Sequence, residues 1–296
     1  MRLDGTTPLW IAARVLLYER GEELFRRRDK VIKTLDPEDI HDLRVASRRM
    51  REGLALFAPC YPPENINRVD KKVKKVIRFL GDIRNTDEAI LFFTALADEL
   101  DDTCRRDMEP FLASYRNERK REVHRLKNGL KKLAAEGLRD LYLRTINALS
   151  LFTSPENGID LFSPLSGFAK DSLDSRFSII QELLPKARAI GAIEAQHRLR
   201  IAVKHFRYRM ELLSFLLGVD FPQLYAAVKD YQDVLGTMHD LDVFSGIIRE
   251  ADFSSETEKL VLDAIHAKRE EFFRNFSGML ETIPLEKIGE RVRNVL

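Results

Sequence analysis

The feature of this 296-residue chain that most constrains its fold is an internal repeat. Residues 41–51 (HDLRVASRRMR) align without gaps on residues 197–207 (HRLRIAVKHFR). Residues 80–87 (LGDIRNTD) match residues 235–242 (LGTMHDLD) in the same order, and the two offsets differ by a single residue. Such a pair of matches predicts a duplicated unit whose two halves pack as a pseudo-symmetric pair.

Both halves carry the periodicity of helices. Gly and Pro are scarce, at 14 and 11 residues, and no stretch shows the sustained alternation of a strand. The sequence therefore predicts an all-α protein. We expect helices over residues 9–33, 37–57, 67–80, 86–100, 109–135, 166–184, 192–217, 223–248 and 256–282.

The strongest loop signals lie between residues 150 and 165. Three dipeptides typical of turns gather there, namely Ser154-Pro155, Asn157-Gly158 and Ser163-Pro164. We therefore expect residues 1–150 to form the first helical repeat and residues 160–296 the second.

The repeated segment predicts a column of cations on one face of each helix. A 3-4-3 spacing keeps four side chains within roughly 80° of arc, because a helix turns about 100° per residue. We call these sets the first basic row (His41, Arg44, Arg48, Arg51) and the second basic row (His197, Arg200, Lys204, Arg207). Apolar residues occupy a separate face of each helix (Leu43, Ala46, Met50, Leu54 and Phe57; Leu199, Ala202, Phe206, Met210 and Leu213).

The two basic rows favour an anion-binding role. The net charge is only +2, so an anion site requires segregation of charge onto one surface. Like charges three and four residues apart destabilise a helix, and a bound polyanion would remove that repulsion. A solvated charged face is the usual explanation of one such row. Its duplication at the same spacing favours a binding site.

Further cations follow on the next helix of the first half. Lys74, Lys75 and Arg78 share one side of it, whereas in the second half Lys229 matches Lys74 and Asp233 replaces Arg78. We therefore expect the first half to be the more basic side of the site. Tyr208, which borders the second basic row, is the aromatic residue best placed to touch a ligand.

At these residues the chain resembles the CHAD family, the conserved-histidine α-helical domain proteins. The family's His-x-x-Arg-Val-x-x-Arg-Arg-x-Arg segment is matched by His41, Arg44, Val45, Arg48, Arg49 and Arg51. Its second-half counterpart is matched by His197, Arg200, Lys204, Arg207, Tyr208 and Glu211. The Leu-Gly-x-x-x-Asp-x-Asp element fits residues 235–242, while the first copy has Asn85 where an Asp is usual.

The resemblance implies two antiparallel four-helix bundles around a basic central groove that binds inorganic polyphosphate, often at polyphosphate granules. Family members are often fused to a triphosphatase barrel with a Glu-x-Glu-x-Lys strand, which this sequence lacks. We therefore expect a stand-alone binding module without a cofactor or a metal, in which phosphate or sulfate ions would also occupy the groove. The residues expected to bind are His41, Arg44, Arg48, Arg49, Arg51, Lys74, Lys75, Arg78, His197, Arg200, Lys204, Arg207, Tyr208 and Lys229.

The two row histidines leave two roles open. Each would donate hydrogen bonds to phosphate oxygens, or each would tie two helices together through a buried hydrogen bond. We expect the remaining histidines to be surface or packing residues (His124, His205, His239, His266).

A metal-dependent phosphohydrolase is one competing hypothesis. It would combine His41 and His197 with Asp87, Asp240 or Asp242. The surrounding cations disfavour a metal ion, and no helix carries two ligands at the i, i+4 spacing of a strong metal motif. We therefore expect no catalysis.

A nucleic-acid-binding protein is the stronger alternative, because DNA and RNA are also chains of phosphates. Such proteins usually add exposed aromatic side chains. Here the candidates fall mainly on apolar faces, which predicts that they belong to the core (Phe57, Phe79, Phe92, Phe206, Phe215). A helical scaffold for an acidic protein partner is a third possibility.

The sequence also predicts a location. Cys60 and Cys104 are too few for a disulfide framework, and the first residues lack the shape of a signal peptide. No segment approaches 18 consecutive apolar residues. We expect a cytoplasmic protein that has no membrane partner and that associates with polyphosphate granules.

Overall fold

The computed structural model describes residues 2–149 and 159–296. Apart from one antiparallel bridge between Pro8 and Pro164, the regular structure of these residues is helical, which confirms the all-α prediction. The chain forms two compact units. Unit 1 comprises the residues up to Thr86 together with Glu118–Lys170, and unit 2 comprises Asp87–Asn117 together with Asp171–Leu296.

Each of these units consists of residues that contact one another. The expected boundary at residues 150–160 instead separates the two copies of the sequence repeat. The division by repeat stays a prediction. Its loop signals Ser154-Pro155 and Asn157-Gly158 lie outside the described residues.

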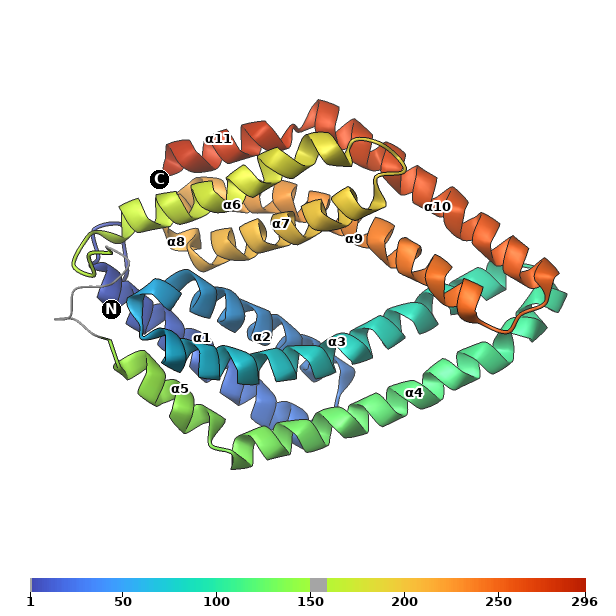
Figure 1. The fold of residues 1–296 in the computed structure, drawn as a ribbon, viewed down its shortest axis with the longest axis horizontal. Helices are drawn as coiled ribbons and strands as arrows, with labels where there is room; N and C mark the ends of the chain where they lie inside the picture. The colour runs from blue at the N-terminus through green and yellow to red at the C-terminus, as the bar shows by residue number, and fades with distance from the viewer. Residues whose placement is uncertain (1, 150–158) are drawn as a thin grey trace. The chain divides into compact units, whose positions relative to one another are not determined.

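Unit 1 is built on a hairpin of two helices (Figure 1). Pro37 opens the second of them at the first helical position, and the Asp36 carboxylate accepts a hydrogen bond from the Glu38 N–H at 2.9 Å. The elements that contribute to unit 1 are α1 (Leu9–Thr34), α2 (Pro37–Phe57), η1 (Ala58–Cys60), the first part of α3 (Pro63–Glu99), the second part of α4 (Asp102–Ala135), α5 (Leu138–Asn147) and the start of α6 (Leu165–Ala187).

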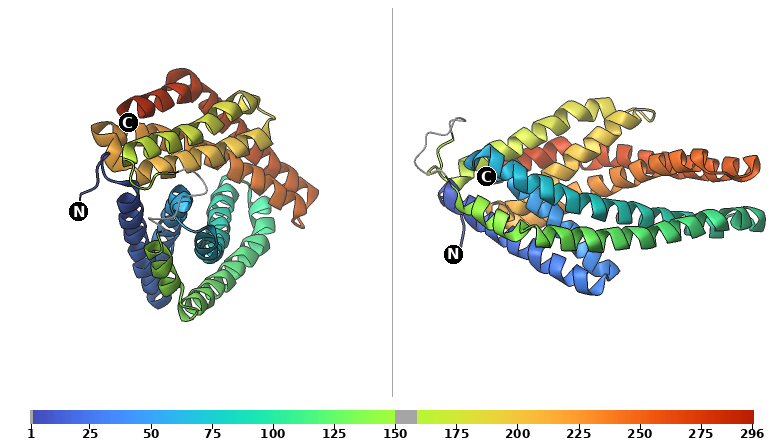
Figure 2. Two further views of the ribbon diagram at one scale, coloured as in Figure 1. Left: turned by 60° about the vertical axis from the view of Figure 1, so that its left-hand side comes forward. Right: turned by 60° about the horizontal axis from the view of Figure 1, so that its bottom comes forward.

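Unit 2 contains a second long hairpin, formed by α9 and α10 and seen in both views of Figure 2. At the end of this hairpin, Phe93 of α3 packs against Phe244 of α9 and Phe111 of α4, each with ring centroids 5.2 Å apart. Besides α6 and the parts of α3 and α4, its elements are α7 (Ile193–Leu212), α8 (Ser214–Leu217), η2 (Gly218–Asp220), α9 (Phe221–Glu250), α10 (Ser255–Thr282) and α11 (Leu285–Val295).

Three predicted helix boundaries were wrong. Gly81 does not interrupt α3, since a helical Gly costs only about 1 kcal/mol and the buried stripe continues from Leu80 to Ile83. The helix expected from residue 109 begins at Asp102, because the Asp101 carboxylate accepts hydrogen bonds from two backbone N–H groups of the first turn. The helix expected to reach residue 217 breaks at Leu213, between α7 and α8.

Two short helices, α5 and α11, were not predicted, and both are held by a contact between an aromatic ring and a glycine. The Tyr142 ring of α5 lies where a Cβ on Gly21 of α1 would be, and the Phe177 ring of α6 does the same at Gly289 of α11. Gly21 and Phe177 are each the thirteenth residue of their helix, and Tyr142 and Gly289 are each the fifth. The large and small partners are therefore exchanged between equivalent positions of the two halves.

The starts of α1 and α6 add a third match to the proposed repeat. Each is an Asp-x-x-x-Pro-Leu segment, at Asp4–Leu9 and Asp160–Leu165. The two segments pair, because the Leu9 N–H donates to the Ser163 carbonyl at 3.0 Å and the Leu165 N–H donates to the Thr7 carbonyl at 2.9 Å. The duplication itself stays a prediction from the sequence matches.

Candidate basic surfaces

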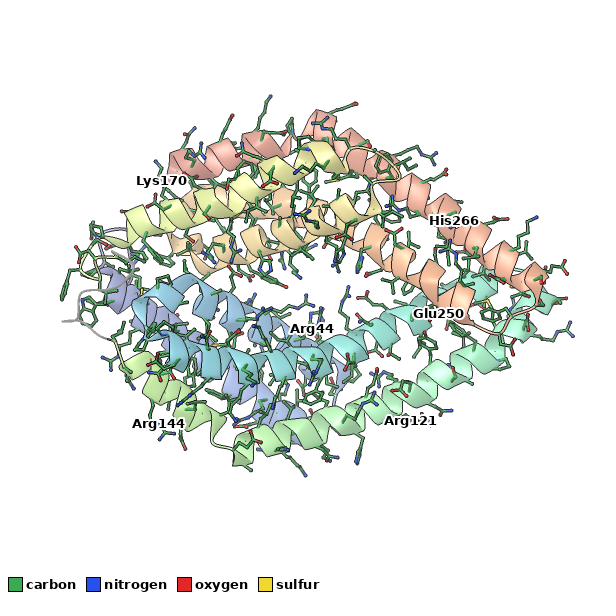
Figure 3. All side chains as sticks on the ribbon, in the orientation of Figure 1. Arg44, Arg121, Arg144, Lys170, Glu250 and His266 are labelled. Carbon is green, nitrogen blue, oxygen red and sulfur yellow. The ribbon has the colours of Figure 1, made fainter. Side chains whose placement is uncertain are left out.

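The helix of the first basic row is amphipathic as predicted. Its five predicted apolar residues, from Leu43 to Phe57, are all at most 1% exposed. On the other side His41 is exposed, and its Nδ1 lies 3.5 Å from a terminal nitrogen of Arg44 on the next turn (Figure 3). Arg44, Arg48 and Arg51 are half-buried. The sequence pattern of α2 therefore becomes one buried side and one cationic side.

Asp70 joins the first basic row to the cations of α3 within unit 1. Its carboxylate lies 3.4 Å from Arg51 Nε on α2 and 2.5 Å from Lys74 Nζ on α3. Asp70 was not singled out from the sequence, although a carboxylate four residues before a lysine on a helix is a recognisable pairing signal. Asp70 thus links the last arginine of the first basic row to Lys74 of α3.

The other predicted cations of α2 and α3 differ in their surroundings. Lys75 and Arg78 are exposed, and within the described part of the chain no ion pair holds either of them. Arg49 points to a different side of α2, because it follows Arg48 by about 100° of helical turn. Its guanidinium lies 3.6 Å from Glu23 of α1. A direct role of Arg49 in binding stays a prediction.

The second basic row has the same amphipathic base. Its predicted apolar residues, from Leu199 to Leu213, are all buried, with Ala202 the most exposed at 8%. His197, however, is hydrogen-bonded to a residue that we had expected only at the surface or in packing. Its Nδ1 lies 3.0 Å from Nδ1 of His239 on α9, and the two ring centroids are 4.3 Å apart. Of the two roles left open for His197, the structure shows the tie between helices.

Burial and charge keep His239 neutral. Desolvation is the main cause that lowers the pKa of its imidazole to about 4, and the nearby charges of Arg200 and His197 act in the same direction. Of two facing Nδ1 atoms only one can donate, so at neutral pH one imidazole is the donor and the other is the acceptor. The pair can therefore hold one shared hydrogen bond between α7 and α9.

Arg207, the last residue of the second basic row, is half-buried and contacts uncharged partners. Its Nε donates to the Gln232 side-chain oxygen at 2.7 Å, and Nη1 donates to the hydroxyl of Tyr225. The guanidinium also lies 4.6 Å from the ring centroid of Tyr208 and 5.3 Å from that of Tyr225. Tyr208 is only 8% exposed, so it supports Arg207 more than it meets solvent.

Lys229 is the remaining predicted contact in unit 2. Its ammonium lies 2.6 Å from the Asp233 carboxylate one turn later, and that hydrogen bond raises the pKa of Lys229. Lys74 has a similar ion pair with Asp70, but Asp70 lies four residues before its lysine whereas Asp233 lies four residues after. Each half thus has one lysine of its long helix paired with a local carboxylate.

The described residues offer little for the competing metal hypothesis. Among them no three His, Cys, Asp or Glu side chains gather as a metal site would require. A separate pocket of about 380 Å³ lies in unit 2 between α3, α9 and α10. Its lining is mainly apolar, and Leu91, Phe92 and Phe244 contribute to it. No residue of either basic row lines this pocket.

One predicted core residue was misplaced. Phe215 is 37% exposed, because it lies in the short α8, which begins at Ser214 after the break at Leu213 and does not continue the stripe of α7. Within the part of the chain that the structure describes, no single helix is long and apolar enough to cross a membrane. The segments Ile193–Leu212 and Ser214–Glu250 meet that criterion only together, across a bend of 77°.

The fold of this chain is similar to those of solved protein structures. A crystal structure of the CHAD domain from the plant Ricinus communis matches with a TM-score of 0.65 and 21% identity, over 99% of this chain and 94% of that one. PptA from Streptomyces chartreusis matches with a TM-score of 0.69 and 13% identity, over 93% of this chain and 99% of that one. A comparison with curated protein sequences gave no match.

At such identities the structural likeness shows a shared fold. The family comparison goes further, because the model of the CHAD domain matches residues 16–249 and so includes both basic rows. The chain belongs to the CHAD domain family.

Proposed function

We propose that this protein binds inorganic polyphosphate through both basic rows and performs no chemistry on it. The observation that carries the proposal is the shared design of α2 and α7. Each helix buries one complete apolar side and presents a histidine and three further cations at the same 3-4-3 spacing on the other. A ligand with evenly repeated negative charge matches such a row, and membership of the CHAD family supports this ligand.

The side chains of the rows suit phosphate in particular. A guanidinium is a planar fork that can bond two phosphate oxygens at once, and five of the eight row residues are arginines. Arg207 is already oriented by Gln232 and Tyr225, so less side-chain freedom is lost when it binds. Preorganised cations favour a densely charged chain over dilute single ions.

The aromatic residues favour a chain without bases. Phe57 and Phe206 are buried in the cores under the rows, and Tyr208 is nearly covered. Stacking on exposed rings is a main source of affinity in proteins that bind single-stranded nucleic acids. We therefore propose polyphosphate ahead of DNA or RNA, with the cytoplasm and polyphosphate granules as its location.

The test is a titration with long-chain polyphosphate at near-physiological salt, with double-stranded DNA and RNA as competitors. Arg48→Glu/Lys204→Glu should lower the affinity by about 100-fold or more, since it reverses one charge in each row. Arg144→Glu/Arg274→Glu is the matched control, because it makes the same net charge change at exposed residues of α5 and α10. Figure 3 labels Arg144 on α5.

The proposal fails in two ways. If the row variant, still folded, binds as well as its control, the rows are not the site. If nucleic acid displaces polyphosphate at equal phosphate concentration, the rows bind phosphate chains in general and the nucleic-acid alternative is favoured.

A further inference from the structure

A buried charged network lies directly behind the histidine pair of unit 2. Arg269 of α10 is 7% exposed, and its Nε donates to the Asp242 carboxylate of α9 at 3.1 Å. Its Nη2 donates to the side-chain oxygen of Gln196 on α7. One side chain thus bridges three helices.

Gln196 extends the network to α6. Its side-chain NH₂ donates to the carbonyl of Ala187, the last residue of α6, at 3.2 Å and to that of Ala189, two residues beyond, at 2.7 Å. Both donors and the acceptor of this buried amide are therefore engaged. The first turn of α7 is held from two sides.

The network and the histidine pair occupy adjacent turns. On α7, Gln196 immediately precedes His197. On α9, Asp242 follows His239 by three residues, so these two side chains lie on one side of the helix. Resting on the proposed function, we propose that Arg269 is a positioning residue for the anion site. By joining Gln196 to Asp242, it fixes the two turns that carry His197 and His239.

Stability alone does not account for this arginine. Its Nη1 is enclosed and finds no hydrogen-bond partner among the described residues. A buried ion pair with an unsatisfied donor is a poor source of stability, and apolar replacements of such pairs are often neutral or stabilising. A network of this kind is better suited to specifying one geometry.

Arg269 also sets the charge next to the pair. Arg200 and His197 disfavour the protonated form of His239, whereas Asp240 and Asp242 favour it. The Arg269 guanidinium offsets the Asp242 carboxylate. Without it, Asp242 would draw a proton onto the pair and repel a polyanion at the second basic row.

The test compares Arg269→Met with Arg269→Lys in the full chain. Arg269→Met keeps an unbranched aliphatic stem, shorter than that of arginine, but removes the charge and the donors. We expect it to weaken polyphosphate binding about tenfold and to raise the pKa of His239, followed by NMR of the imidazole resonances. Arg269→Lys keeps the charge but reaches a single acceptor, so it should have a smaller effect in both measurements.

Tyr231→Phe is the control for a loss of stability in the same unit. It removes a buried hydrogen bond from the Tyr231 hydroxyl to the Ile283 carbonyl, 2.7 Å long and separate from the network. This variant should leave the pKa of His239 and the affinity unchanged. The inference is overturned if Tyr231→Phe weakens binding as much as Arg269→Met, or if Arg269→Met leaves both measurements unaltered.

Two further outcomes are decisive. If Arg269→Met does not fold, Arg269→Lys decides, and unchanged affinity and pKa would overturn the inference. If the wild-type protein does not bind polyphosphate, the proposed function fails. The pKa of His239 in the two Arg269 variants then shows whether Arg269 positions the pair.

Discussion

The two basic rows share one spacing but are fixed in different ways. His41 is exposed and lies beside Arg44 of its own helix, whereas His197 is tied to His239 of another helix. The position equivalent to His239 in the first half is Arg84, the fifth residue of the segment that begins at Leu80. A cation there cannot reproduce the imidazole pair, so the same helical pattern gives one exposed histidine and one anchored histidine.

The last arginines of the rows show the same contrast. Arg51 meets Asp70, and Arg207 meets Tyr225. These partners are equivalent, because Asp70 stands four residues before Lys74 and Tyr225 stands four residues before Lys229. A carboxylate compensates the charge of the first arginine, while the second is oriented by uncharged groups. Two arginines at matching positions of the rows therefore differ in how much of their charge is available to a ligand.

The largest effect should come from removing these two arginines one at a time. Arg207→Ala should weaken polyphosphate binding by about 2–3 kcal/mol, because it removes a preoriented charge whose full value is available to phosphate. Arg51→Ala should weaken polyphosphate binding by only about 1 kcal/mol, since the Asp70 carboxylate already compensates the charge of Arg51. Titration of the two variants measures the difference. Equal losses would mean that local partners do not tune the rows.

The sequence predicted those features that depend on residues close together in the chain. The burial of one side of α2 and α7 followed from helical spacing, and the start of α2 followed from Asp36 and Pro37. The row cations were found on the opposite side for the same reason. Periodicity and capping are local properties, so a single sequence contains them.

The remaining features depend on partners distant in sequence. His239 was assigned to surface or packing because nothing in its own segment identifies His197 as its neighbour. Asp70, Tyr225 and Gln232 were missed for the same reason, although alignment of the two halves would have marked Asp70 and Tyr225 as equivalent positions. The predicted helix ended before Gly81 because glycine is a common turn signal. The buried stripe on either side of it outweighs that signal, and α3 continues.

The exchanged aromatic and glycine pairs allow a stability test of the same comparison. Gly289→Ala should destabilise the protein by about 1–3 kcal/mol, because the new Cβ would overlap the Phe177 ring. Gly81→Ala is the matched control. Nothing lies within 4 Å of its added Cβ, so a gain of about 0.5–1 kcal/mol is expected. Chemical denaturation measures both changes.

Transplanting the arrangement of the first half sharpens this test. Gly289→Tyr alone should be strongly destabilising, and adding Phe177→Gly, which reproduces the pair of Gly21 and Tyr142, should recover much of the loss. Recovery would support the equivalence of the two pairs. If the double variant is no more stable than Gly289→Tyr, the matching positions do not reflect interchangeable packing.

Asp70→Asn should make the first half resemble the second. The change leaves the shape of the side chain but removes the charge that holds Arg51 and Lys74. We expect polyphosphate affinity to rise by about 1 kcal/mol or less, because these pairs are partly exposed and screened. The gain should shrink as salt is raised. Asp140→Asn on α5 is a control with the same charge change, and an equal gain there would attribute the effect to net charge alone.

The last effect is the pH dependence of stability that the anchored histidine produces. The pKa of His239 is lowered to about 4 from an ordinary value of 6.5, so the unfolded chain binds more protons between these values. Its contribution to the free energy of unfolding is therefore fully present above pH 6.5 and is lost as the pH falls towards 4. His239→Asn should flatten this part of the curve, whereas His41→Asn should leave it in place, since His41 is exposed. Equal curves for the two variants, measured by urea denaturation between pH 4 and pH 7, would show that the two rows hold their histidines alike.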